Sequence, residues 1–109
     1  MIARERRDVL AIVRAVAERY HVTAEDLRMS SAAHAAQARR LTAPRSVAMY
    51  LVVTDARCSL SATGRFFGRH HTSVLHAVRV VAANHARHEW VREEIGALRA
   101  AISSAIGGA

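Results

Sequence analysis

Residues 59–77 hold two helix-forming segments separated by one tight turn, and this arrangement constrains the fold more than any other feature of the chain. Ser59 is a favoured residue immediately before a helix, and the segment that follows it ends at Gly68. Glycine readily adopts the left-handed conformation of a helix C-terminal turn. The spacing therefore predicts a helix-turn-helix, with its first helix at about 60–67 and its second at about 71–86.

Apolar residues recur at helical spacing in the N-terminal part of the chain as well. Residues 2–20 carry valines and a tyrosine three or four positions apart, with charges on the other face, which predicts a long amphipathic helix. Thr23 is followed three positions later by Asp26. This is the pattern of a capping box, and it predicts a short helix to about Arg28. Residues 29–41 lack a clear apolar stripe, so we expect a loop there.

Two further helices complete the prediction. The only proline, Pro44, suits the first turn of a helix, because its missing N–H is not needed there. We expect this helix to run from Pro44 to about Ala56. The last helix is predicted at about 89–105, with Trp90 and Ile102 among its buried residues. Because the valine-rich segments lie inside helical periodicity, no strand is predicted, and the expected fold is an all-α small helical bundle.

The length and the single cysteine limit the kind of protein this is. A chain of 109 residues is of the usual size for one core. We divide it into an amphipathic helix at 1–21, a helix-turn-helix domain at 22–88, and a helix at 89–109 that packs on it. Cys58 is the only cysteine of the sequence, so an intramolecular disulfide is not possible, which is typical of a reducing cytoplasm. The sequence shows neither a membrane-spanning run nor a signal peptide.

Positive charge is concentrated in the middle of the chain. Between Leu27 and His88 there are nine arginines and one acid, Asp55, and the formal net charge of the whole chain is +7. Such a balance favours an anionic partner, nucleic acid first and acidic lipid second. All 16 basic residues are arginine. A phosphate-binding loop that ends in Gly-Lys-Ser/Thr is therefore excluded, and we expect no ATP.

The second helix of the helix-turn-helix opens with four residues that can hydrogen-bond: His70, His71, Thr72 and Ser73. The major groove of DNA admits one helix, and side chains in the first turns of that helix reach base edges. His76 lies one turn further on, and Arg69, in the turn, is placed to contact a backbone phosphate. We therefore expect double-stranded DNA as the partner. The structural alternatives are that His71, Thr72 or Ser73 caps the helix and that His76 packs beside the apolar stripe.

Two segments resemble the C-terminal DNA-binding domain of the bacterial chromosomal replication initiator DnaA family. They are Pro44-Arg-Ser-Val-Ala-Met-Tyr-Leu51 and the run from Ser59-Leu60 through Gly64-Arg-Phe-Phe-Gly-Arg-His-His-Thr-Ser-Val-Leu-His-Ala77. The family shows Pro-Arg-Gln-x-Ala-Met-x-Leu, then Ser-Leu-x-x-Ile-Gly-x-x-Phe-Gly-Gly-Arg-Asp-His-Thr-Thr-Val-x-His-Ala. The resemblance spans roughly residues 22–81. It implies a TrpR-like, DnaA domain IV-like helical bundle that recognises a DnaA-type box in duplex DNA.

The resemblance also implies roles for single residues. In the family, the Asp-His-Thr-Thr run reads the major groove, the arginine of Pro-Arg contacts phosphate, and a basic loop inserts an arginine into the minor groove. Carried across, these roles fall on His70, His71, Thr72 and Ser73, on Arg45, and on Arg39 or Arg40.

The sequence departs from the family pattern at several points. His70 stands where the family has Asp, which replaces a hydrogen-bond acceptor with a donor. One of the paired glycines is missing, so the turn is a residue shorter. The loop expected before Pro44 is longer and holds only Arg39 and Arg40 as basic residues. The ATPase module that precedes this domain in the family is absent from the sequence.

Two functions are compatible with these observations. The first is a stand-alone, sequence-specific DNA-binding protein that regulates transcription or replication without ATPase activity, in the cytoplasm at the nucleoid. The alternative is a helical adaptor that has lost base reading, in which the outer faces of helices 2–20 and 89–105 carry the function and could form a homodimer. A basic amphipathic helix at 2–20 could also lie on acidic membrane, but its apolar residues have a simpler use in the core.

Catalysis, cofactors and metals are not expected. No His-Glu-x-x-His pattern is present, and one cysteine with scattered histidines makes a poor zinc site. A single acid in the central region leaves few groups for acid–base chemistry. We therefore expect a protein that is not an enzyme and that needs no cofactor or metal.

Overall fold

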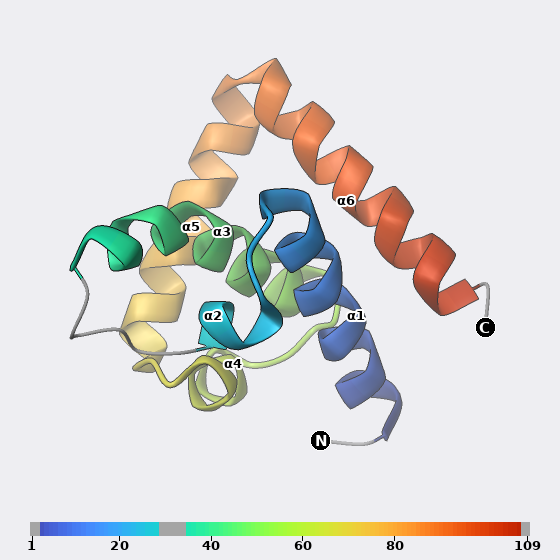
Figure 1. The fold of residues 1–109 in the computed structure, drawn as a ribbon, viewed down its shortest axis with the longest axis horizontal. Helices are drawn as coiled ribbons and strands as arrows, with labels where there is room; N and C mark the ends of the chain where they lie inside the picture. Colours follow the sequence, from blue (N-terminus) through green and yellow to red (C-terminus); the bar gives the residue numbers. More distant parts are fainter. Residues whose placement is uncertain (1–2, 29–34, 108–109) are drawn as a thin grey trace.

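The computed structural model describes residues 3–28 and 35–107, and Figure 1 shows these parts as helices joined by short connections. In chain order the helices are α1 (Ala3–Tyr20), α2 (Ala24–Arg28), α3 (Ala35–Thr54), α4 (Leu60–Phe67), α5 (His71–Arg87) and α6 (Glu89–Gly107). The described residues contain no strand, so the all-α prediction is confirmed. None of the helices within residues 3–28 and 35–107 is both long enough and apolar enough to cross a membrane.

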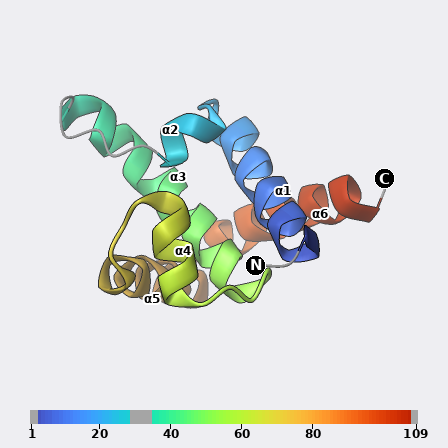
Figure 2. The ribbon, with the colours of Figure 1, turned by 90° about the horizontal axis from the view of Figure 1, so that it is seen from below.

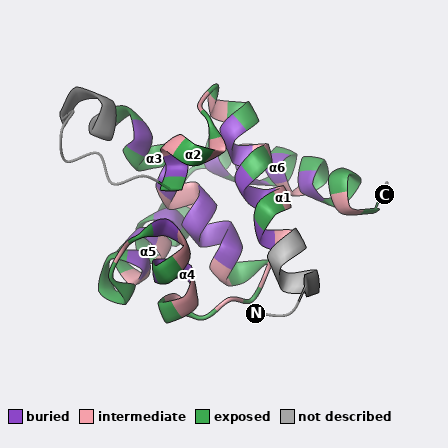
Figure 3. Cartoon of the chain, turned by 60° about the horizontal axis from the view of Figure 1, so that its bottom comes forward, coloured by how far each residue is buried: buried purple, intermediate pink, exposed green. Residues whose placement is uncertain are grey.

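The hydrophobic core lies around α3, which contacts α1, α2, α4 and α5. Figure 2 shows α3 in the middle of the molecule, and Figure 3 shows buried residues along its central part. Val13 of α1, Leu51 of α3 and Phe67 of α4 are fully buried there. On the other side of α1 lies α6, which buries Ile95 and Leu98. Of the two helices on the opposite side of α3, α4 makes no contact with α6, whereas α5 contacts α3, α4 and α6.

The central helix begins earlier than the sequence pattern indicates. Residues 35–41, which we expected to form a loop, are the first two turns of α3, and Pro44 lies inside this helix rather than in its first turn. An interior proline leaves one helical hydrogen bond unmade. The preceding residues compensate, because alanine has the highest helix propensity and Leu41 is buried in the core. Residues 29–34, the other part of the expected loop, lie outside the described residues.

The prediction that Trp90 is buried is wrong. The side chain of Trp90 is 64% exposed, whereas Val91, Ile95, Leu98 and Ile102 are buried. Their spacing of four, three and four residues defines one face of α6, and the position before Val91 is rotated about 100° away from that face. Ile102 is buried as expected.

The helix-turn-helix is formed by α4 and α5 and follows the predicted boundaries closely. Ser59 caps α4, because its Oγ accepts a hydrogen bond of 3.0 Å from the backbone N–H of Ala62. Gly68 ends α4 in the left-handed conformation, with φ of 64°. The backbone N–H of Arg69 then donates to the carbonyl oxygen of Gly64 over 2.8 Å. This bond closes the turn tightly and sets the direction in which α5 leaves it.

The predicted capping box before α2 is also confirmed. The backbone N–H of Thr23 donates to the carboxylate of Asp26 over 3.2 Å, and the N–H of Asp26 donates to the Thr23 hydroxyl over 2.9 Å. These reciprocal bonds satisfy donors that a helix start leaves free. They hold the five-residue α2 against α3 and α4.

Candidate nucleic-acid interface

The residues that open α5 lie together on the surface. His70, His71, Thr72, Ser73 and His76 are all exposed, whereas Val74 and Ala77, on the inner face of the same helix, are buried. The helix therefore presents its polar first turns outward while its apolar side packs against α3. Hydrogen-bonding side chains in this position can reach the edges of bases in a major groove.

The residue that caps α5 is His70, and not His71, Thr72 or Ser73 as the structural alternatives supposed. His70 has an extended backbone, and its Nδ1 accepts a hydrogen bond of 3.3 Å from the backbone N–H of Thr72. The Thr72 hydroxyl lies 2.8 Å from the same nitrogen. Because Nδ1 accepts, the proton of the neutral ring is carried by Nε2. The cap thus leaves the Nε2–H of His70 as a donor that the helix start does not use.

A groove of about 380 Å³ runs between α3 and α5 beside these residues. Its walls are Thr42, Arg45, Ser46 and Met49 from α3, and Arg69, Ser73, His76, Ala77 and Val80 from the turn and α5. No acidic side chain lines it. Two guanidinium groups and several small polar groups make it suited to an anion such as a backbone phosphate. Thr42 and Ser46 were not expected here, because their shared face on α3 exists only when the helix begins before Pro44.

Arg69 belongs to a second hollow as well. A shallower depression of about 330 Å³ lies between α4 and α5 and is lined by Ser61, Gly64, Arg65, Gly68, Arg69, His70 and His71. The His70 and His71 rings lie face to face at its edge, with centroids 4.2 Å apart and planes tilted by 35°. Arg69 is half-buried between the two hollows. Its position allows it to contact a strand on either side of the start of α5.

Arg45 has a structural role that the sequence pattern does not reveal. Its side chain is only 6% exposed, and its Nε and Nη2 donate to the carbonyl oxygens of Leu27 and Asp26 over 2.8 and 3.1 Å. Burial, and then repulsion from Arg69, lower the pKa of the Arg45 guanidinium below its ordinary value. The side chain thus fastens the end of α2 to the middle of α3, and it brings a positive charge to the bottom of the groove.

The two arginines assigned to a basic loop lie on a helix. Arg39 and Arg40 are in the second turn of α3, and Arg40 is exposed. The side chain of Arg39 lies outside the described residues. The backbone of both positions is therefore helical, and the exposed side chain of Arg40 extends from α3.

The one acid between Leu27 and His88 is neutralised at a distance from this surface. Both carboxylate oxygens of Asp55 accept hydrogen bonds from Arg99 of α6, over 2.9 and 3.0 Å. The hydrogen bond to Asp55 raises the pKa of Arg99 above its ordinary value. The other ion pair of the described residues joins Arg19 to Glu94. Both pairs involve α6, so the start of α5 keeps an uncompensated positive potential.

Comparison with known proteins identifies the family. The family model described as the bacterial DnaA protein helix-turn-helix matches residues 9–81, which include α4, the turn and most of α5. The chain belongs to the bacterial DnaA helix-turn-helix family. Membership of this family implies a DNA-binding domain, in agreement with the exposed polar start of α5.

Individual relatives support the same assignment. The chain is 35% identical over 101 residues to chromosomal replication initiator protein DnaA 1 of Protochlamydia amoebophila. The matched region covers 93% of this chain and 21% of that protein. It is 44% identical over 89 residues to chromosomal replication initiator protein DnaA of a Bradyrhizobium species, covering 81% of this chain and 18% of that protein. The chain therefore spans about a fifth of the length of these relatives.

The departures from the DnaA pattern can now be placed in the structure. The single Gly68 is sufficient for the shortened turn, because it takes the left-handed conformation and α5 begins three residues later at His71. His70, where the family has Asp, caps α5 through Nδ1 and carries a donor at Nε2. The turn is therefore closed with one glycine, and the residue types at the start of α5 differ from the family pattern.

Proposed function

We propose that this protein binds double-stranded DNA in a sequence-specific way, by placing the first turns of α5 in the major groove. In this proposal it recognises a DnaA-type box and regulates replication or transcription at the nucleoid, with no catalytic step of its own. The observation that carries the proposal is the row of exposed hydrogen-bonding residues at the start of α5, next to a groove lined by two arginines and no acid.

The proposal divides the surface into two kinds of contact. We assign base contacts to the outermost residues of the helix start: His70, His71, Thr72 and His76. We assign phosphate contacts to Arg69 and Ser73, which line the groove between α3 and α5. Arg45 acts there mainly through its charge, because two of its nitrogens are bound to carbonyl groups. Arg39 and Arg40, on the preceding helix, are assigned to the flanking minor groove.

Selection of bound duplexes from a random library, followed by mobility-shift titration of the enriched box, tests this function. With four or five phosphates neutralised, the logarithm of the association constant should fall with the logarithm of salt concentration at a slope of about −4. Arg69→Ala should weaken binding to all duplexes and make this slope shallower by about 1. His71→Ala should instead reduce discrimination between the box and other sequences, by about 1–3 kcal/mol.

Arg87→Ala is the matched control for Arg69→Ala. Arg87 is an exposed arginine at the far end of α5, whereas Arg69 lies in the turn before this helix. Its replacement should leave both the affinity and the salt slope close to those of the original protein. Equal losses from the two variants would show that only total charge matters, and a salt-independent affinity would contradict the phosphate contacts.

The cap on α5 leads to a second expected result. The Nε2–H of His70 can donate to an acceptor on a base edge, such as purine N7, but it cannot accept from the amino group of cytosine. His70→Asp keeps a good N-cap residue and restores an acceptor. We expect this variant to fold normally and to change the preferred base at one position of the selected site from guanine, which offers only acceptors in the major groove, to cytosine, which offers an amino group. An unchanged site would show that His70 caps the helix without reading a base.

A further inference from the structure

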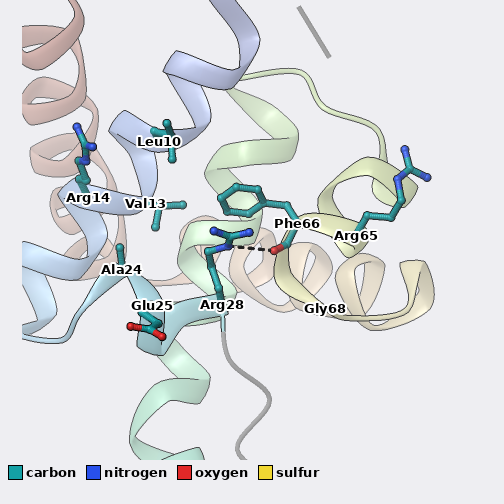
Figure 4. A pocket seen from close by; sticks show the side chains of 9 residues that line it. All are labelled: Leu10, Val13, Arg14, Ala24, Glu25, Arg28, Arg65, Phe66 and Gly68. Atoms are coloured by element: carbon teal, nitrogen blue, oxygen red, sulfur yellow. Dashed lines mark hydrogen bonds between the residues drawn. The ribbon is translucent and has the colours of Figure 1, made fainter. Parts of the chain in front are cut away.

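Besides the two hollows at the start of α5, a larger groove lies on a part of the surface that the proposed DNA contacts do not use. It has a volume of about 650 Å³ and is formed by α1, α2 and the end of α4, as Figure 4 shows. Leu10 and Phe66 give it accessible apolar surface, and Val13, which also lines it, is buried. Leu10 is 36% exposed, although it lies on a helix that otherwise packs its apolar residues in the core. The groove thus offers apolar surface to a partner.

The rim of this groove is positive. Arg14, Arg28 and Arg65 line it, against one acid, Glu25. The guanidinium of Arg28 lies 4.2 Å from the centre of the Phe66 ring and donates through Nε to the Phe66 carbonyl oxygen over 3.3 Å. Figure 4 shows this pair in the middle, with Arg14 and Arg65 on either side. Within the described residues, none of the three arginines forms an ion pair with an acid. The groove therefore fits an acidic segment that carries a large apolar side chain.

The chain itself presents such a segment at the start of α6. Trp90 is 64% exposed, and its neighbours on the helix surface, Glu89 and Glu93, are exposed as well. The nearby Arg92 turns back to donate to the carbonyl oxygens of His85 and Ala86 at the end of α5. Among the described residues, Glu89 and Glu93 form no ion pair, and the indole, whose ring centroid lies 6.2 Å from that of His88, is open to solvent. Tryptophan in this setting is the residue type most enriched at the centres of protein interfaces.

We propose that the protein associates head to tail, with Trp90 of one copy placed in the α1–α2–α4 groove of the next. In this contact the indole packs on Leu10 and Phe66, and Glu89 and Glu93 face the arginines of the rim. Figure 1 shows the junction of α5 and α6 at one end of the molecule and α4 at the other. One molecule therefore offers the two surfaces on opposite sides, so each copy can engage two neighbours.

This geometry makes the contact heterologous, because two different surfaces meet. A heterologous contact repeats in one direction instead of closing into a symmetric dimer. In so far as the proposed DNA binding holds, it favours two copies bound to boxes that point the same way over two copies bound to inverted boxes. DNA also raises the effective concentration of the copies, so that a weak contact becomes visible as cooperative binding.

Sedimentation velocity without DNA tests the contact independently of the proposed function. We expect the sedimentation coefficient of the original protein to rise with concentration, and Trp90→Ala and Arg65→Glu each to remain monomeric. An equimolar mixture of the two variants should form a dimer, because one still has the groove and the other still has the indole. Val80→Ala, which changes another exposed apolar residue, should associate like the original protein. A monomeric original protein, or a mixture without dimer, would overturn the proposal.

Mobility shifts on duplexes with one or two selected boxes give the second measurement. On two boxes that point the same way, the original protein should bind the second box at least about five-fold more tightly once the first is occupied. We expect Trp90→Ala to bind a single box with unchanged affinity and to lose this increase in affinity. If the original protein does not bind a single box, only the DNA-binding proposal is contradicted, because the sedimentation experiment contains no DNA. Cooperativity retained by Trp90→Ala, or equal on inverted boxes, would overturn the head-to-tail contact.

Discussion

Gly64→Ala is expected to destabilise the protein by about 3 kcal/mol, at the upper end of the cost of overpacking a well-filled interior. A methyl group at this position would meet the carbonyl oxygen of Arg69, a backbone atom that cannot rotate away. The carbonyl carbon of Arg69 and the backbone nitrogen of His71 would lie 3.5 Å from it. The variant must therefore push α4 and α5 apart at the turn. Denaturant unfolding measures the loss.

Gly96→Ala is the matched control for this variant. Gly96 also lies inside a helix, but a methyl group there would have no neighbour within 4 Å. Alanine has a higher helix propensity than glycine, so this variant should be more stable by up to about 1 kcal/mol. If Gly64→Ala behaved like Gly96→Ala, the close approach of the two helices at the turn would be disproved. A separate mobility-shift assay below the unfolding transition would show whether the displaced turn also weakens DNA binding.

The helix-turn-helix could be predicted from the sequence because its signals are local. A serine before α4, a glycine after it and the apolar spacing of α5 each act within a few residues, and the structure confirms all three. The role of Gly64 could not be predicted in this way. In the sequence it is a glycine inside a helical pattern, and only the approach of the Arg69 carbonyl shows why a side chain is excluded.

Predictions failed where tertiary contacts outweigh a local preference. Pro44 is a reliable sign of a helix start only when nothing stabilises the turns before it, and here Leu41 packs in the core ahead of it. The apolar pattern of the last helix predicts a buried Trp90, but the neighbouring Val91 begins the buried face of α6. An aromatic residue one position outside an apolar stripe is exposed by geometry, whatever its hydrophobicity.

The sequence predicts where the candidate interface lies, but it does not predict the hydrogen bonds within that interface. Charge and the polar opening of α5 mark the surface, because both are properties of a continuous stretch of sequence. The cap made by His70 depends on an extended backbone and a ring orientation that composition does not encode. The groove beside it depends on α3, so residues such as Thr42 and Ser46 become visible only in the folded chain.

Arg45 gives the clearest separation of a structural role from a binding role. Arg45→Leu is expected to lower the free energy of unfolding by about 2–4 kcal/mol, because it leaves the carbonyl groups of Leu27 and Asp26 without their charged donor. Arg40→Ala, an exposed arginine on the same helix, should change stability by less than about 0.5 kcal/mol. Chemical denaturation of the two variants provides the comparison.

Arg45→Lys then distinguishes geometry from charge. Lysine keeps the positive charge beneath the groove, but its single ammonium lacks the planar fork that reaches two carbonyl oxygens at once. We expect this variant to lose much of the stability lost by Arg45→Leu and yet to keep the salt dependence of DNA binding. If Arg45→Leu unfolds like the original protein while its salt slope becomes shallower by about 1, Arg45 is a phosphate contact first, and its hydrogen bonds to α2 contribute little.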